Sequence, residues 1–191
     1  MTASACRGTG RARYPHPVDQ AAHYRNLAAL GRDEFLASAA PAAFVRFKAI
    51  DLPQDSLDQT LSMDESADEE EVDETMPIGK VTLGDVVHME IYPLVKKPGA
   101  SFPDRITIGR TSNNDIVVAD ASISRLHAYV RRDGRAWVVA DGGSKNGSWL
   151  KGHTLEARRE RPLESRAVLR IGDVDLTFYL ANDLYAMLGG A

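Results

Sequence analysis

Apolar residues follow two different spacings along the chain. In the first part they recur at helical intervals, as Tyr24, Leu27 and Leu30 illustrate. Residues 42–50 alternate only weakly and fit either a strand or a third helical piece. Residues 18–50 are therefore predicted to be a small helical segment. A segment with so few apolar residues buries little surface on its own. It therefore either docks on another part of the chain or serves as an interaction module.

From Lys80 onward, short runs of β-branched and aromatic residues alternate with turn signals such as Asn146-Gly147. Strands are predicted at 86–94, 105–109, 115–118, 128–132, 136–140, 148–151, 167–171 and 175–180. Many short strands in succession predict an all-β domain, a β-sandwich over residues 80–181. A short closing helix, capped by Asn182, is expected within residues 182–191.

Two segments lack any apolar period. Residues 1–17 are rich in Gly, Arg and Pro and are predicted to be disordered. Residues 51–75 contain 11 Asp and Glu and no Lys or Arg, although the whole chain of 191 residues has a net charge of only -4. Self-repulsion and low hydrophobicity predict an extended, disordered acidic linker over residues 51–79. The charge pattern is thus a mildly basic body interrupted by one acidic segment.

Cysteine content and hydropathy limit the classes of protein to which the chain can belong. The single cysteine, Cys6, cannot form an internal disulfide, so a disulfide-stapled secreted domain is not expected. The chain shows no apolar stretch of the length needed for a secretory signal or a membrane span. We therefore expect a cytoplasmic protein without membrane association.

Three polar patches, at 108–116, 122–127 and 141–148, fall at predicted strand ends or in loops. Together they offer two guanidinium groups, an ammonium group, several hydroxyls and an amide. These groups suit a phosphate dianion and the main chain of an extended peptide. They do not suit proton abstraction or metal binding.

The order and spacing of these patches resemble a forkhead-associated (FHA) domain, a β-sandwich of two antiparallel sheets that binds phosphothreonine peptides. The resemblance covers about residues 80–180. It rests on Gly-Arg at 109–110, Ser-Arg-Leu-His at 124–127, Ser-Lys-Asn-Gly at 144–147 and the Ile-Gly-Asp-Val turn at 171–174. The sequence departs from the family pattern at Ser148, where Thr is commoner, and at Lys151-Gly152, where Asn-Gly is common.

The resemblance implies a role for each site residue. Arg110 would form charge-assisted hydrogen bonds to the phosphate, and the Ser124 hydroxyl would donate a further one. Arg125 and Lys145 would add positive potential, and Asn146 would hold the peptide main chain. Structural support of the site is expected from Gly109, His127, Asp141, Ser144 and Gly147. The implied function is a phosphothreonine-peptide-binding signalling adaptor, with phosphothreonine-containing proteins as partners.

Two other classes are less well supported. His88, His127 and His153 lack metal-ligand spacing, and no Gly-rich phosphate loop precedes a helix, so no enzyme, metal or cofactor is expected. Residues 76–191 carry 16 basic against 13 acidic side chains, and the acidic segment would repel a nucleic acid. A structural or assembly protein that binds partners independently of phosphate stays open as the alternative.

Two threonines of the acidic segment, Thr60 and Thr75, are candidate phosphorylation sites. Each follows acidic residues and precedes an apolar residue by three positions, a position on which FHA domains commonly select. We therefore expect a Ser/Thr kinase as a partner and binding of the modified linker in cis or in trans. If the domain starts at Val86, the 26-residue span from Thr60 favours cis and the 11-residue span from Thr75 favours trans. An unmodified solubilising linker is the alternative.

Overall fold

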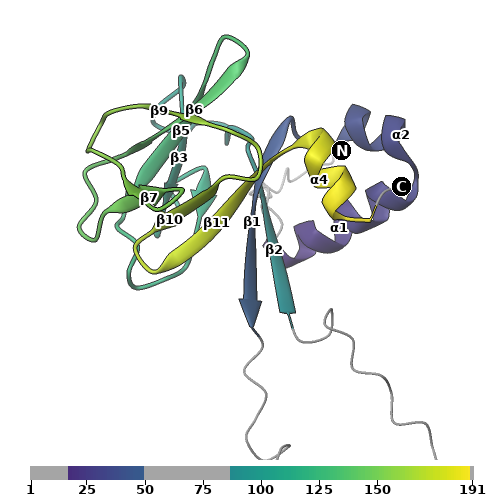
Figure 1. Cartoon of the computed structure of the whole chain (residues 1–191), viewed down its shortest axis with the longest axis horizontal. Coiled ribbons are helices and arrows are strands. Elements are labelled where there is room, and N and C mark those ends of the chain that lie inside the picture. The colour runs from purple at the N-terminus through teal and green to yellow at the C-terminus, as the bar shows by residue number, and fades with distance from the viewer. Residues whose placement is uncertain (1–16, 50–86, 190–191) are drawn as a thin grey trace, which may run out of the picture.

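The computed structural model of the chain describes residues 17–49 and 87–189 (Figure 1). Thr60 and Thr75, the predicted linker at 51–79 and nearly all of the predicted disordered segment at 1–17 lie outside the described residues.

The described strands form two sheets. The six-stranded sheet has the order β2-β1-β11-β10-β7-β8, with β1 at Ala42–Ala49, β2 at Val87–Pro93, β7 at Ser148–Leu150, β8 at His153–Thr154, β10 at Val168–Ile171 and β11 at Val174–Leu180. The five-stranded sheet has the order β4-β3-β5-β6-β9, with β3 at Ile106–Gly109, β4 at Ile116–Val117, β5 at Ala128–Asp133, β6 at Ala136–Asp141 and β9 at Arg161–Leu163. Neighbouring strands are antiparallel except β3 and β4, which pair in parallel. The predicted all-β sandwich with a short N-terminal helical segment is confirmed.

The two sheets pack face to face through a shared apolar core. Phe178 of the six-stranded sheet contacts Phe44 of the same sheet and Trp137 of the opposite one, with ring centroids 5.6 and 6.1 Å apart. All three side chains belong to one buried cluster that also contains Val130 and Leu169. Burying each such side chain contributes about 1.5–3 kcal/mol, so this core fixes the strands from which the loops emerge.

The segment at 18–50 differs from the predicted small helical segment, because its last part forms strand β1. Helices α1 (Pro17–Ala29) and α2 (Arg32–Ser38) are followed by β1, which pairs with both β2 and β11. Ala42 and Phe44 face the sandwich core, while Ala43 and Val45 face the helices. Because both faces of this strand are buried, the apolar run lacks the alternation that would have predicted it.

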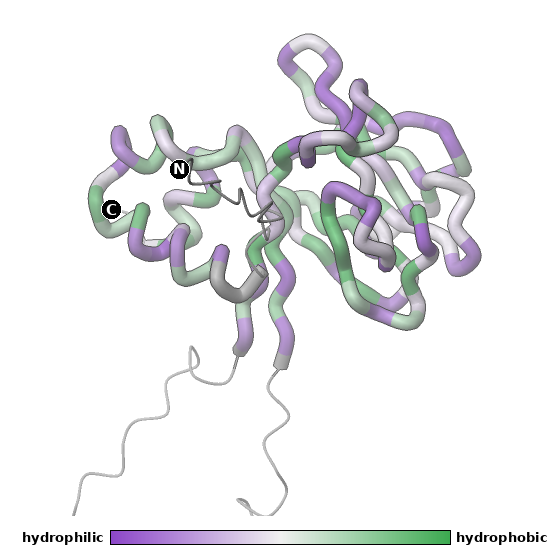
Figure 2. The backbone as a smooth tube through the Cα atoms, turned by 180° about the vertical axis from the view of Figure 1, so that it is seen from behind, coloured by the Kyte–Doolittle hydropathy of each residue, from purple (hydrophilic) through white to green (hydrophobic). Residues whose placement is uncertain are grey.

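The helices cover the outer face of β1 and β2. Tyr24 of α1, Phe35 of α2 and Tyr185 of helix α4 (Ala181–Met187) pack against Val45 and Ile91 in a second buried cluster. Figure 1 shows α1, α2 and α4 together on the side of β1 and β2 opposite the sandwich. In Figure 2 hydrophobic positions gather where helices and strands meet. The N-terminal helices are thus an integral layer of the fold.

The C-terminal helix and two short strands differ from the predictions. Helix α4 begins at Ala181 with Leu180 as its N-cap, and no side chain caps it. The amide oxygen of Asn182, the predicted cap, instead accepts a hydrogen bond from Arg32 of α2 at 3.1 Å. Strands β8 and β9 were not predicted, because they are two and three residues long and largely exposed.

The pairing of β1 with β2 changes the predicted position of the acidic segment in the fold. Ala49 lies directly opposite Val87, so residues 50–86 connect two neighbouring strands of one sheet. They are an insertion within the sandwich and not a linker that precedes it at residue 80. Thr60 follows Ala49 by 11 residues and Thr75 precedes Val87 by 12. Both spans allow about 36–43 Å at full extension, so the predicted preference of Thr60 for cis and Thr75 for trans is wrong.

Candidate functional site

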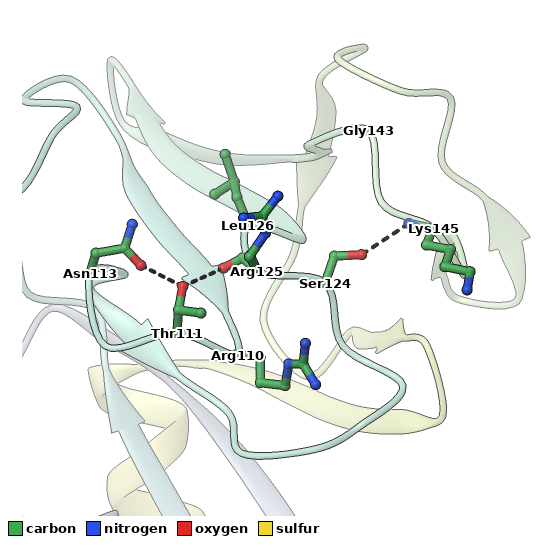
Figure 3. A pocket seen from close by; sticks show the side chains of 8 residues that line it. All are labelled: Arg110, Thr111, Asn113, Ser124, Arg125, Leu126, Gly143 and Lys145. Carbon is green, nitrogen blue, oxygen red and sulfur yellow. Dashed lines mark hydrogen bonds between the residues drawn. The ribbon is translucent and has the colours of Figure 1, made fainter.

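Three loops at one end of the sandwich enclose a cavity of about 840 Å³ (Figure 3). The loops follow β3, β4 and β6. The cavity is lined by Arg110, Thr111, Asn113, Ser124, Arg125, Leu126, Gly143 and Lys145. This lining holds three cationic side chains and no carboxylate, so its potential favours an anion.

The backbone fixes Arg110 beside Ser124. The Arg110 N–H donates to the Ser124 carbonyl at 3.0 Å, and the Lys145 N–H donates to Ser124 Oγ at 3.0 Å. The hydroxyl oxygen is therefore used as an acceptor, and its own proton has no acceptor among the described residues. In Figure 3 Arg110 lies below Ser124 and Lys145 to its right, while Arg125 and Leu126 lie to its left. A hydroxyl held in this way donates to an anion at little entropic cost.

Gly109 is required by the close approach of two loops. A Cβ atom at this position would lie 2.2 Å from the Arg125 carbonyl oxygen and 2.7 Å from Asn114 Nδ2. The buried Asn114 amide donates to that same carbonyl at 2.6 Å and to the Thr111 carbonyl at 2.9 Å. Thr111 Oγ1 donates to the Arg125 carbonyl as well, at 3.0 Å. These bonds hold the Arg110 and Arg125 backbones at a fixed separation.

His127 lies fully buried beneath the cavity and links two of its loops. Its Nδ1 accepts the Ser124 N–H at 3.0 Å, and its Nε2 donates to the Gly147 carbonyl at 2.9 Å. The bond to the Ser124 N–H assigns the proton to Nε2. Both ring nitrogens are engaged, so the ring braces the loops and does not face the cavity as a base.

Asp141 organises the third loop. Its Oδ1 accepts the N–H groups of Gly143 and Ser144, at 2.7 and 2.9 Å. Its Oδ2 accepts the hydroxyls of Ser144 and Ser148, both at 2.6 Å. Ser144 Oγ in turn accepts the Gly147 N–H at 2.9 Å. Burial opposes the charge of Asp141, yet these hydrogen bonds outweigh burial and hold its pKa below the usual value.

This carboxylate predicts a loss of stability in acid. Its pKa is lower in the folded than in the unfolded chain, so its contribution is complete above the unfolded value of about 3.9 and is lost as the pH falls through the folded pKa. Asp141→Asn should lower the free energy of unfolding at pH 7 by about 2–3 kcal/mol and flatten its decline below pH 4. Urea titrations at pH 7 and pH 3 measure both effects, with the exposed Asp175→Asn as the matched control. Equal acid slopes for Asp141→Asn and wild type would contradict the assignment.

Asn146 lies apart from the other predicted site residues. It does not line the cavity, and its Nδ2 donates to the Ser122 carbonyl at 2.7 Å. It borders a separate hollow of about 490 Å³ together with Trp149 and Arg170. Its Oδ1 has no donor among the described residues, so this oxygen is the part of Asn146 that remains for a ligand.

Strand β1 also supports the site. Arg46 NH2 lies 3.4 Å from Asp120 Oδ2, and Asp120 Oδ1 accepts both the N–H and the hydroxyl of Ser122, at 3.0 and 2.7 Å. Ser122 Oγ accepts the Asp173 N–H at 3.0 Å. Hydrogen bonds from Ser122 are the main reason why the pKa of Asp120 is lowered. A residue outside the resembling region thus anchors the loop that carries Ser124.

Sequence reasoning missed part of the site. Four lining residues lie within the predicted polar patches but were assigned no individual role, namely Thr111, Asn113, Leu126 and Gly143. Asn114 lies in the first of these patches, yet the bond from its side chain to the Arg125 carbonyl was not predicted. The position of Thr111 directly after Arg110 was the one available signal for it.

Metal-binding clusters and membrane-spanning helices are both absent from the described part of the chain. No group of three or more His, Cys, Asp or Glu among them could hold a metal ion. No described helix has the length and apolar character needed to cross a membrane.

The FHA domain family matches residues 106–172. An FHA domain-containing protein of Arabidopsis thaliana is 33% identical over 78 residues, which are 40% of this chain and 19% of that protein. The oxoglutarate dehydrogenase inhibitor of Corynebacterium diphtheriae is 36% identical over 72 residues, 38% of this chain and 48% of that protein. The chain thus spans less than half of the length of either relative. A solved structure of Mycobacterium tuberculosis EmbR with a low-affinity phosphopeptide is 30% identical, covering 48% of this chain and 22% of that one, with a TM-score of 0.41.

The family match and the site coincide. Residues 106–172 contain every residue that lines the cavity and every side chain that braces its loops from within the sandwich. Residues 106–172 of this chain are an FHA domain.

Proposed function

We propose that the protein is a phosphothreonine-peptide-binding signalling adaptor. The observation that carries the proposal is the cavity lined by Arg110, Arg125, Lys145 and Ser124, because its lining contains three cations and a hydroxyl but no carboxylate. A phosphorylated side chain brings a charge of about −1.5 to −2 and three acceptor oxygens. That ligand offsets the mutual repulsion of the three cations and uses the donors that the loops present.

Each residue has a distinct task in this proposal. Arg110 forms bidentate hydrogen bonds to the phosphate, for which its planar guanidinium is suited better than an ammonium group. Ser124 donates its hydroxyl proton to a third phosphate oxygen. Lys145 and Arg125 add positive potential, and Asn146 binds the peptide main chain through its free amide oxygen.

The partners follow from this chemistry. They are proteins that a Ser/Thr kinase has phosphorylated on threonine, and we propose that the adaptor binds them in the cytoplasm. It acts as a binding module and not as an enzyme, because the tasks above need no cofactor, metal or catalytic base. The FHA domain at residues 106–172 supports this reading, since the resemblance of these motifs implies phosphothreonine binding.

The same site gives a route to self-regulation. A kinase phosphorylates Thr60, Thr75 or both, and the modified insertion occupies the cavity of its own chain or of a second copy. Both threonines lie 11 or 12 residues from a strand of the sandwich, so the tether favours neither of them. The modified segment thereby competes with outside ligands.

Peptide selectivity tests the binding function. A degenerate peptide library is prepared in three matched forms, with phosphothreonine, phosphoserine or unmodified threonine at one fixed position. Titration should show phosphothreonine binding at least about 100-fold tighter than threonine, since charge-assisted hydrogen bonds are lost. Phosphoserine should bind about fourfold more weakly, the value of one buried methyl group. Equal binding of all three forms would favour the phosphate-independent assembly protein instead.

A further inference from the structure

A second cavity, of about 720 Å³, lies between helix α1, strand β2 and residues 115–119. We call it the β2 groove. Strands β2 and β4 are edge strands of the two sheets, and both border this groove. Its volume lies in the range of ligand-binding pockets, and it sits where the N-terminal helices meet the sandwich. Only its 115–119 wall belongs to the FHA domain match.

The lining of the β2 groove combines apolar walls with cations. Val95, which is 51% exposed, and the partly exposed Val117 contribute accessible apolar surface, and Arg46, Lys48 and Lys97 contribute positive charge. The Lys48 side chain is 43% exposed, so it can turn toward a ligand while it stays near its partner. Apolar side chains beside a partly exposed lysine suit a peptide that alternates carboxylates with apolar side chains.

Both carboxylates of the β2 groove are already used within the protein. Glu90 accepts the Lys48 ammonium at 3.0 Å and the Tyr92 hydroxyl at 2.7 Å. Asp115 accepts the Lys96 ammonium at 2.7 Å and the N–H and hydroxyl of Thr107 at 2.8 and 2.9 Å. Neutralised and hydrogen-bonded carboxylates repel an incoming acidic ligand only weakly.

The topology brings one acidic segment to this groove. Residues 50–86 leave the sheet after Ala49 and return at Val87, and these two residues are paired. Lys48, the neighbour of Ala49, lines the groove, so the segment starts and ends at the mouth of the groove. Within it, residues 51–75 carry 11 carboxylates, no Lys or Arg, and interspersed Leu, Met and Val.

We propose that the β2 groove is the docking site of the chain's own unmodified acidic segment, residues 51–75. Carboxylates of the segment pair with Lys48, and its apolar side chains cover the accessible surface of Val95 and Val117. This role is separate from phosphothreonine binding, because it uses neither Arg110 nor a phosphate group.

Tethering makes weak contacts sufficient. A segment anchored beside its site has an effective concentration on the order of 1 mM, so an intrinsic Kd of about 1 mM already gives half occupancy. That Kd corresponds to only about 4 kcal/mol, which a few exposed ion pairs and two or three buried apolar side chains supply. The β2 wall from Val87 to Pro93 is seven residues long, about 23 Å, and a similar number of extended residues spans it.

Paramagnetic broadening in the full chain tests the proposal. Cys6→Ser removes the single cysteine, and a nitroxide is attached at Ser56→Cys in protein that no kinase has modified. We expect the label to broaden the amide signals of Ile91, Val95 and Ile116 selectively. A matched chain with Asn and Gln in place of the 11 acids of residues 51–75 has the same tether and should lose at least half of that broadening. Lys48→Gln should reduce it as well, whereas Lys151→Gln, on the far edge of the sheet, should not.

Several results would overturn the proposal. Uniform broadening, or broadening that survives neutralisation of the segment, would show that no specific docking occurs. Broadening between a labelled and an unlabelled copy would make a second chain the occupant. Arg110→Ala should leave the groove signals unchanged, so the outcome is independent of whether the phosphothreonine proposal holds.

Discussion

Replacement of Arg110 by alanine is expected to weaken phosphothreonine-peptide binding by at least about 100-fold. In the proposed complex the Arg110 guanidinium supplies two charge-assisted hydrogen bonds to the phosphate, each worth about 1.5–3 kcal/mol. Arg110→Lys keeps the charge but not the fork and should recover only part of the affinity. Isothermal titration with one phosphothreonine peptide measures all three proteins.

The control for Arg110 separates binding from folding. Arg110 is exposed, so its removal should change the free energy of unfolding by no more than about 0.5 kcal/mol. Arg135→Ala removes another exposed arginine, at the tip of the β5–β6 hairpin, and should leave the affinity unchanged. Undiminished peptide affinity in folded Arg110→Ala would place the phosphate elsewhere.

Phosphorylation of the insertion should block the site to outside peptides by a similarly large factor. With an effective concentration of about 1 mM and an intrinsic Kd near 10 µM, the apparent Kd of a competing peptide rises about 100-fold. The measurement is a titration of kinase-treated and untreated protein with a labelled phosphothreonine peptide. Thr60→Ala and Thr75→Ala, singly and together, identify the acceptor, since the double variant should bind equally with and without kinase.

Protein concentration distinguishes the two modes of self-binding. Competition in cis is independent of the concentration of the adaptor, whereas competition in trans grows with it and produces dimers in light scattering. Equal peptide affinity of modified and unmodified wild type would contradict self-regulation in either mode. It would leave the Arg110 result untouched.

Patterns that depend on neighbours in sequence predicted most of the sandwich. Strands β5 and β6 were visible because short runs rich in Val and aromatic residues flank the turn signal Asp133-Gly134 of their hairpin. Strand β1 was left open between strand and helix, because its run of apolar residues is buried by the sandwich on one face and by helices on the other. Its pairing with β2 across the acidic insertion depends on contacts that no local pattern encodes.

The same contrast between local motifs and contacts of distant residues holds for the site. The motif residues Arg110, Ser124 and Lys145 line one cavity, while their roles toward a phosphate stay predictions. The clamp made by Asn114 was missed, because a buried amide and a turn-forming amide have the same sequence signature. Arg46 was missed because its contact with Asp120 spans 74 residues and joins a strand outside the motif region.

The pairing of Ala49 with Val87 has a practical meaning for anyone who divides this protein. A fragment that starts at residue 80 lacks the strand between β2 and β11, so it loses the ring that packs on Phe178 and gains two unpaired sheet edges. A protease cut between residues 50 and 86 has the opposite effect, since the two pieces remain joined by strand pairing and two hydrophobic clusters. Covalent continuity through the acidic insertion is therefore dispensable for the sandwich, whereas the residues before it are not.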